Sequence, residues 1–310
     1  MVRLTPTRPG GRSRAADSGS RRADRGLGES LDSLYRDFNA ADSASDPVHL
    51  VRPFADPRDR EIAGFCAGAL AFGRVASVLN SISTLFGIMG PRPASFVRRF
   101  DPAAPHPELR AMVHRWTRGT DLVALLWILR QMLERSGTIE QFFLEGYDPS
   151  HEDVGPALDS FSTRALKLDM RRAYGKVPAR AGVCYFFPRP SAGSACKRLN
   201  LYLRWMVRRD EVDLGVWSGL PAAKLIVPLD THVIRLGRCL KLTRYTSPGW
   251  RMAADITASL RTLDPRDPVR FDFSICHVGM MNACGFGRKQ GDSQCPLRGL
   301  CHPRQRGARR

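Results

Sequence analysis

Hydrophobic residues recur with a helical period along most of this chain. From residue 30 onward, Leu31, Leu34, Tyr35 and Phe38 fall on one stripe of a helix. No clear run of alternating hydrophobic and polar residues follows, apart from the short segment 183–187, which ends at a proline. The pattern therefore predicts an all-α fold. Helices are expected over residues 30–38, 57–73, 75–89, 93–100, 107–116, 121–135, 138–146, 154–174, 194–208, 247–263 and 269–281, with another beginning near 228.

Local signals mark where three of these helices begin. Asp56-Pro57 has a capping residue followed by proline in the first turn. Thr138 stands three residues before Gln141, which is the spacing of a capping box. Asp230 follows Pro228 and is expected at the cap or in the first turn of its helix. Small residues between 63 and 73 would let the second helix pack closely against a neighbour.

The charge of the chain indicates a polyanionic partner. Lys and Arg number 48 against 30 Asp and Glu, a formal net charge of +18, and the pI is about 10.4. Cationic side chains that neutralise phosphates release condensed counterions, so such an excess favours nucleic-acid binding. The two ends carry less than half of the excess. We interpret residues 1–29 as a disordered basic arm, 30–303 as one helical domain and 304–310 as a basic tail.

The sequence predicts a cytoplasmic protein with no membrane partner. The longest clean apolar run, residues 122–129, is far shorter than the roughly 20 residues that a spanning helix needs. The N-terminus has no apolar segment typical of an export signal. Four of the eight cysteines crowd into residues 276–301, and without export this crowding favours metal over disulfides.

One lysine and one aspartate are the best candidates for chemistry. Lys197 lies just inside a predicted helix, where the positive helix end disfavours the ammonium form, and a neutral amine can attack a sugar C1′. The alternative is that Lys197 contacts a phosphate or solvent. Asp230 would suit the stabilisation of positive charge on the sugar, although an aspartate here is most often a structural cap.

Two segments carry a resemblance to a known superfamily. Gly193-Ser-Ala-Cys-Lys197-x-x-Asn200 followed by Leu229-Asp230-Thr-His-Val-x-Arg235 resembles the helix-hairpin-helix DNA glycosylases, in which Gly-x-Gly-x-Lys precedes Val-Asp-Thr-His-x-x-Arg. The region from about Asp46 to Pro303 is also similar to an uncharacterised bacterial family distantly related to those enzymes. Its marks include Asp59-Arg-Glu-Ile-Ala, Arg204-Trp-Met-Val-Arg and Asp264-Pro-x-Asp267-Pro.

The resemblance implies two helical subdomains flanking a cleft, and a base-excision DNA repair enzyme with AP-lyase activity. Lys197 would be the Schiff-base nucleophile and Asp230 the catalytic carboxylate. The sequence departs from the pattern at Ala195, which replaces the second hairpin glycine. The 33 positions between Lys197 and Asp230 exceed the usual spacing and are similar to archaeal 8-oxoguanine glycosylases. An oxidised purine such as 8-oxoguanine is therefore the expected substrate, and damaged duplex DNA the partner of a monomeric, nucleoid-associated protein.

The cysteine-rich loop, residues 276–303, resembles the iron–sulfur loop of the same superfamily, whose pattern is Cys-x6-Cys-x2-Cys-x5-Cys. The second ligand is missing, since Asp292 stands where a cysteine is expected. An iron–sulfur cluster, zinc and a vestigial loop of thiols all stay open. The candidate ligands are Cys276, Cys284, Cys295 and Cys301.

Further residues are predicted to contact the nucleic acid or a flipped base. The predicted nucleic-acid contacts are Gly193, Ser194, Arg198, Arg204 and Arg235, and the predicted base pocket is Tyr185, Phe187 and Trp205. The alternative for the aromatic residues is packing in the core. A catalytically silent nucleic-acid-binding protein of the same fold is the alternative function, and an RNA- or ribosome-associated factor, resting on charge alone, is the third.

Overall fold

A computed structural model describes residues 14–40, 46–280 and 295–301, with side chains from residue 26 onward. The described chain is mostly helical, as the hydrophobic pattern predicts. The elements are α1 (Arg14–Phe38), α2 (Val48–Val51), α3 (Pro57–Leu70), α4 (Val75–Met89), α5 (Pro93–Arg99), α6 (Pro107–Ala111), β1 (Val113–His114), β2 (Thr117–Arg118), α7 (Gly119–Ser136), α8 (Ile139–Leu144), α9 (Gly155–Ala165), α10 (Arg171–Tyr174), the 3-10 turns η1 (Gly182–Phe186), η2 (Pro190–Ala192) and η3 (Ala222–Lys224), α11 (Lys197–Val207), α12 (Thr231–Cys239), α13 (Trp250–Arg261) and α14 (Asp272–Met280).

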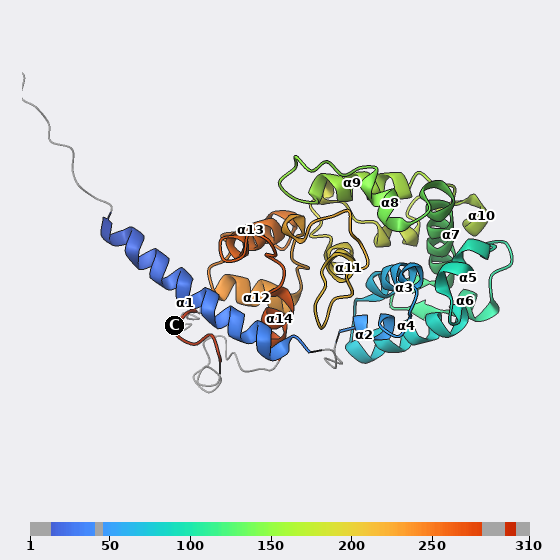
Figure 1. The fold of residues 1–310 in the computed structure, drawn as a ribbon. Helices are drawn as coiled ribbons and strands as arrows, with labels where there is room; N and C mark the ends of the chain where they lie inside the picture. The colour runs from blue at the N-terminus through green and yellow to red at the C-terminus, as the bar shows by residue number, and fades with distance from the viewer. Residues whose placement is uncertain (1–13, 41–45, 281–294, 302–310) are drawn as a thin grey trace, which may run out of the picture.

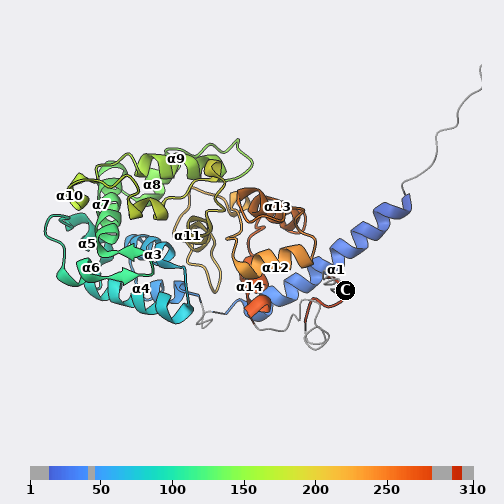
Figure 2. The same cartoon turned by 180° about the vertical axis from the view of Figure 1, so that it is seen from behind.

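The helices form two groups with α11 between them (Figures 1 and 2). Helices α2 to α10 make the larger group. Helices α12, α13 and α14 make the smaller one, and α1 lies against α14. The N-terminal half of α1 projects beyond the rest of the molecule in both views. Because α11 carries Lys197 at its start, the candidate nucleophile lies between the two groups.

Helix α11 packs closely on α3, and small residues of α3 allow it. A Cβ on Gly64 would lie 2.7 Å from Cε of Met206, and one on Gly68 would lie 3.4 Å from the Arg198 carbonyl oxygen. The ring of Tyr202 on α11 meets Phe65 on α3 edge to face, with 5.0 Å between the centroids. This contact fixes α11, and with it Lys197, against the larger group of helices.

The predicted helix starts are confirmed. Asp56 caps α3 by accepting a hydrogen bond from the Arg58 amide, and Thr138 caps α8 by accepting one from Gln141. Asp230 caps α12 by accepting one from Val233. These starts could be predicted because each cap contacts a residue only two or three positions ahead.

The structure corrects several boundaries. The segment 183–187 is not a strand: residues 183–186 belong to η1, and Phe187 follows it. The helix predicted over 154–174 is divided into α9 and α10. Asp121 does not precede α7 but lies in its first turn, where its carboxylate accepts from the Arg118 amide at 2.9 Å.

Two further differences concern the N-terminal segment, which was expected to be disordered, and residues 107–116, which were expected to form one helix. Within the predicted disordered arm, residues 14–29 belong to α1. Leu31 and Leu34 anchor the C-terminal half of this helix in the core, and such packing supplies most of a helix's stability. The predicted helix 107–116 ends at Ala111, and the antiparallel hairpin β1–β2 follows, pairing His114 with Thr117.

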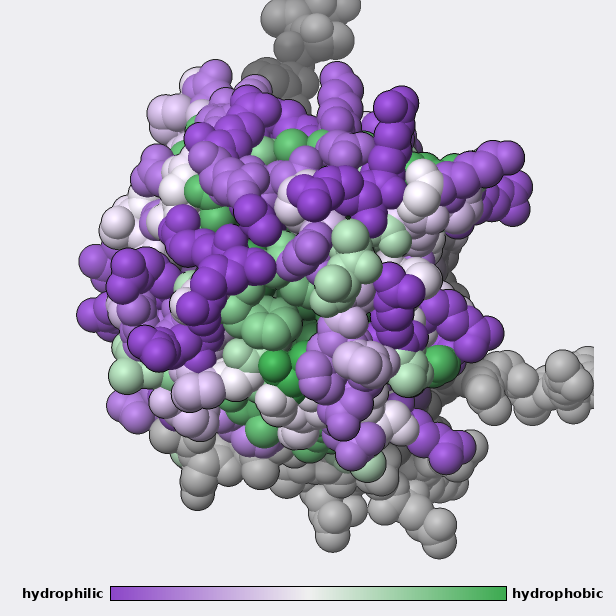
Figure 3. Space-filling view, turned by 90° about the vertical axis from the view of Figure 1, so that its right-hand side faces the viewer, coloured by the Kyte–Doolittle hydropathy of each residue, from purple (hydrophilic) through white to green (hydrophobic). Residues whose placement is uncertain are grey.

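Within residues 14–40, 46–280 and 295–301, no helix has the length and apolar character needed to cross a membrane. Figure 3 shows one face of the molecule, on which hydrophilic side chains surround a hollow where hydrophobic side chains gather.

Candidate functional site

Lys197 is positioned by a tight turn with two left-handed residues. Gly193 has φ +81°, a conformation that favours glycine because it has no Cβ. Cys196, immediately before α11, has φ +49°, which is rare for a residue with a side chain. The Ser194 hydroxyl accepts from the Cys196 amide at 3.1 Å, and the Asn200 side chain donates to the Ala195 carbonyl at 3.0 Å. The turn therefore presents Lys197 as the first residue of α11 in a fixed conformation.

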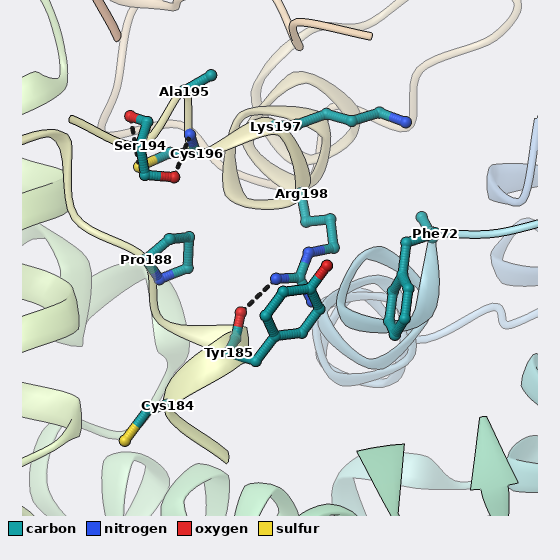
Figure 4. A pocket seen from close by; sticks show the side chains of 10 residues that line it. Phe72, Cys184, Tyr185, Pro188, Ser194, Ala195, Cys196, Lys197 and Arg198 are labelled. Carbon is teal, nitrogen blue, oxygen red and sulfur yellow. Dashed lines mark hydrogen bonds between the residues drawn. The ribbon is translucent and has the colours of Figure 1, made fainter. Parts of the chain in front are cut away.

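Lys197 lines a pocket of about 370 Å³. The walls are Ala71 and Phe72, which follow α3, the 3-10 turn at Cys184 and Tyr185, Pro188, and residues 194–198. Figure 4 shows the Lys197 side chain extending from the start of α11 above Arg198, on the side of the pocket where Phe72 lies. The structure thus brings Lys197 together with three other predicted site residues, Ser194, Arg198 and Tyr185.

Arg198, a predicted nucleic-acid contact, is bonded to the protein where it lines the pocket. Its side chain is buried and donates to the carbonyl oxygens of Ala69, at 3.0 Å, and of Tyr185. The guanidinium carbon lies 3.6 Å from the centroid of the Tyr185 ring (Figure 4). Arg198 therefore holds the pocket wall together and orients Tyr185, and two of its five N–H donors are bonded to protein carbonyls.

Arg204 is a clearer correction. Its side chain is 3% exposed and bonds Asp46 at 2.7 Å, Asp213 at 3.1 Å and Asp272 at 2.6 Å. Arg208, which immediately follows α11, adds ion pairs to Asp213, Asp210 and Asp267. A guanidinium surrounded by carboxylates cannot reach a phosphate, so Arg204 joins α11 to α14 and to the segment before α2. The other predicted contacts, Gly193 and Arg235, are exposed.

The carboxylates of this network are electrostatically crowded, since two guanidinium groups pair with five of them, three of which are buried. Burial raises the pKa of Asp272 to about 7, with a further contribution from the charge of Asp230, and Arg204 opposes the rise. Burial likewise raises the pKa of Asp213 to about 6. Oδ1 of Asp272 is buried without a hydrogen-bond partner, which agrees with a carboxyl group that is poorly stabilised as an anion.

Asp230 lies at the start of α12, and both of its oxygens are engaged. Oδ1 accepts from the Val233 amide at 2.7 Å, and Oδ2 accepts from the Cys276 thiol at 3.1 Å. Asp230 is partly exposed, and it lies outside the set of residues that line the Lys197 pocket. The structure therefore places Asp230 at the cap that the sequence predicts, but does not show it in contact with Lys197.

The predicted base pocket is corrected in two of its three residues. Trp205 is fully buried and Phe187 is 2% exposed, so both belong to the core and cannot contact a base. Tyr185 is 38% exposed and lines the pocket beside Lys197. The sequence could not separate these cases, because aromatic residues at helical spacing serve both purposes.

The aromatic neighbours of Tyr185 were missed by the sequence analysis. Its ring centroid lies 5.1 Å from that of Phe72 and 5.2 Å from that of Trp116, and the centroids of Phe72 and Trp116 lie 5.0 Å apart. Trp116 is 52% exposed. It was assigned to a helix, whereas it forms the tip of the β1–β2 hairpin. Its neighbours come from distant parts of the chain, so no local signal marked the cluster.

The candidate metal ligands are only partly described. Cys284 lies outside the described residues. Cys276 points to Asp230, and within the described chain no group of three or more His, Cys, Asp or Glu side chains is arranged to hold a metal ion. Cys295 is buried and Cys301 is partly exposed. A metal at this loop stays a prediction.

Comparison with known proteins gives a family. Residues 46–281 match the model of a family described as a protein of unknown function, DUF2400. The chain belongs to the DUF2400 family. No curated protein and no solved structure matches it. The DUF2400 match contains the Lys197 pocket, Asp230 and Cys276, whereas α1 and residues 295–301 fall outside it.

Proposed function

We propose that the protein is a DNA glycosylase with AP-lyase activity, which excises an oxidised purine such as 8-oxoguanine from duplex DNA. The main support is the pocket of about 370 Å³ that Lys197 and Tyr185 line together. Its volume falls within the range of sites for small molecules, and it offers an aromatic wall and an amine to a flipped nucleotide. The net charge of +18 favours a nucleic-acid substrate.

The proposed chemistry uses the Lys197 amine as nucleophile. Nζ in its neutral form attacks C1′, and the bond from C1′ to the base breaks with its electron pair leaving on the base, which takes up a proton. The new C1′–Nζ ammonium loses a proton, and the nitrogen lone pair then opens the C1′–O4′ bond. O4′ takes a proton, and a protonated Schiff base joins C1′ to Nζ.

Strand cleavage follows from the same intermediate. A general base, here any proton acceptor, removes one proton from C2′. The resulting electron pair forms the C2′–C3′ double bond, and the C3′–O bond breaks with the phosphate as leaving group. Water then hydrolyses the Schiff base and regenerates the Lys197 amine. No oxidant or reductant is needed at any step.

In this proposal Asp230 stabilises the positive charge that develops on the sugar and accepts a proton from the attacking amine. The resemblance to helix-hairpin-helix glycosylases suggests this role. The two hydrogen bonds to its carboxylate would keep it in one orientation. Binding of DNA would have to bring C1′ within reach of both Asp230 and Lys197.

A specific observation favours the second candidate, a DNA-binding protein of the same fold without catalysis. Both oxygens of Asp230 already accept hydrogen bonds within the protein. In that case Asp230 would be a cap alone, and Lys197 would contact a phosphate.

The experiment that separates the two candidates is strand cleavage of end-labelled duplexes that each carry one damaged base. A glycosylase with lyase activity cuts at the damaged position, and Lys197→Ala abolishes the cut. A silent binder retains the duplex in a gel-shift assay and leaves every strand intact.

A further inference from the structure

We infer that the tip of the β1–β2 hairpin is a stacking site for an unpaired nucleotide of single-stranded nucleic acid, with Trp116 as the residue that contacts the base. The site is distinct from the chemistry at Lys197 and stands whether or not that lysine reacts. It rests on the exposure of Trp116, the construction of the hairpin and the charges around it.

Trp116 is an unusual residue to leave in water. Half of its side chain is exposed, at 52%, and its neighbours Phe72 and Tyr185 leave that part of the indole uncovered. By contrast, Trp127, Trp205 and Trp217 are 6% exposed or less. Exposed indole surface costs free energy in water, and bases stack favourably on it.

The hairpin is built to hold this indole in place. Its two-residue tip is Arg115-Trp116, and Arg115 has φ +57°, a conformation that tips normally reserve for Asn or Gly. The adjacent His114 is buried, with Nδ1 2.9 Å from the Ser81 hydroxyl and Nε2 2.9 Å from the Phe72 carbonyl oxygen. A strained tip whose preceding residue is held through both ring nitrogens indicates a position with a use.

The arginine side chain beside the Trp116 indole favours a partner that carries phosphates. The Arg115 guanidinium carbon lies 4.9 Å from the centroid of the Trp116 ring. The stem of Arg115 crosses Gly73, where a Cβ would meet its Cδ at 3.1 Å. Arg74, which follows Gly73, and Arg118, two residues after Trp116, are also exposed. An aromatic platform with a cationic side chain against it is an arrangement by which proteins bind single strands without reading their sequence.

The platform is continuous with the pocket. Phe72 and Tyr185 line the pocket that contains Lys197, and the same two rings contact Trp116. A strand with one nucleotide in the pocket could therefore place a neighbouring base on Trp116. This continuity favours nucleic acid over an apolar or proline-rich peptide, which the exposed indole alone would also suit.

The test uses the full chain and a fluorescein-labelled oligothymidylate of about ten nucleotides, within the site sizes of such binders. We expect Trp116→Ala to weaken binding, measured by anisotropy, about tenfold. Trp116→Phe keeps a ring and should retain most of the affinity. Val113→Ala is the matched control, because Val113 is exposed to the same degree, at 54%, on the same hairpin but offers no ring.

Intrinsic fluorescence supplies a second readout. Oligothymidylate should quench the tryptophan emission of the wild-type protein, and Trp116→Phe should remove most of this quenching while binding persists. Lys167→Ala, whose lysine is exposed outside the pocket, should leave both signals unchanged.

Three outcomes would overturn the inference. They are no binding of the wild type to the oligonucleotide, equal binding by Trp116→Ala, and a loss in Val113→Ala as large as that in Trp116→Ala. The last would indicate a general apolar contact, such as a peptide would make.

Discussion

The thiol of Cys276 donates a hydrogen bond to Oδ2 of Asp230 across 3.1 Å, while Oδ1 of the same carboxylate caps α12. The two residues are 46 positions apart in the sequence and join α14 to the start of α12. Burial, and then the charge of Asp230, raises the pKa of the Cys276 thiol far above its usual range. The thiol therefore remains a donor at any ordinary pH, and Asp230 is held as an acceptor.

The two roles of Asp230 can be separated by substitution. Asp230→Ala removes the cap and should lower the free energy of unfolding by about 1 kcal/mol. Asp230→Asn keeps an oxygen for the Val233 amide, and asparagine caps helices as well as aspartate does, so its stability should stay close to that of the wild type. If Asp230 stabilises charge on the sugar, both variants lose base excision by a hundredfold or more, on the order of other electrostatic contributions.

Urea unfolding and single-turnover excision provide the two measurements. Full excision by Asp230→Asn would show that the carboxylate is a cap only and would remove it from the mechanism.

The protonated state of Cys276 gives a second prediction. Iodoacetamide reacts with thiolates, so Cys276 should resist alkylation in the folded protein at pH 8 and react after unfolding in urea. Cys184 is exposed, and it should react faster in the folded state. Mass spectrometry of the digested protein measures both sites. Rapid labelling of folded Cys276 would contradict the hydrogen bond to Asp230.

The buried network predicts a large loss of stability at Arg204. Arg204→Ala leaves Asp46, Asp213 and Asp272 buried without their shared cation, which should cost about 3–5 kcal/mol of unfolding free energy. Arg58→Ala is the control, because Arg58 pairs with Asp56 on the surface, and it should leave the urea midpoint unchanged. Equal midpoints for the two variants would mean that the network does not stabilise the fold.

The helix caps and Arg204 show which contacts the sequence could predict and which it could not. Asp56, Thr138 and Asp230 were identified as caps because each bonds an amide two or three residues ahead. Arg204 was misjudged because its partners Asp46 and Asp272 lie 158 and 68 positions away. One-dimensional spacing does not reveal such contacts, so a buried cation and a phosphate-binding one have the same local pattern.

In the candidate site, too, the sequence predicted the local features and missed those that depend on tertiary packing. The turn before Lys197 was found because its glycine and its helix start are local features, and Gly193 does adopt a left-handed conformation. Trp116 was missed because a hairpin tip of Arg115 and Trp116 lacks the Asn-Gly signal of a tight turn. Trp205 was misplaced because burial depends on what α3 brings against α11, which tertiary packing alone decides.

The pH dependence of stability should reflect Asp272. Its pKa is raised in the folded state to about 7, from the usual 3.8, by burial. A carboxyl with a raised pKa binds its proton more tightly when folded, so it favours the folded state at low pH, and this contribution is lost as the pH rises from 3.8 through about 7. We expect Asp272→Asn, which stays neutral, to reduce the decline in stability between these pH values.

Urea unfolding at a series of pH values measures this effect. A wild type and an Asp272→Asn variant with parallel stability profiles would show that Asp272 does not titrate in this range. The Arg204 ion pair would then outweigh the burial.

The measurement that bears most directly on the central claim is borohydride trapping on duplexes that contain an abasic site or 8-oxoguanine. Borohydride reduces a Schiff base to a stable amine, so an enzyme that works through Lys197 forms a covalent protein–DNA adduct. The account predicts this adduct for the wild type and for Lys167→Ala, whose lysine is exposed outside the pocket, and its loss in Lys197→Ala. An adduct that survives Lys197→Ala, or no adduct with any damaged duplex that the protein binds, would contradict it.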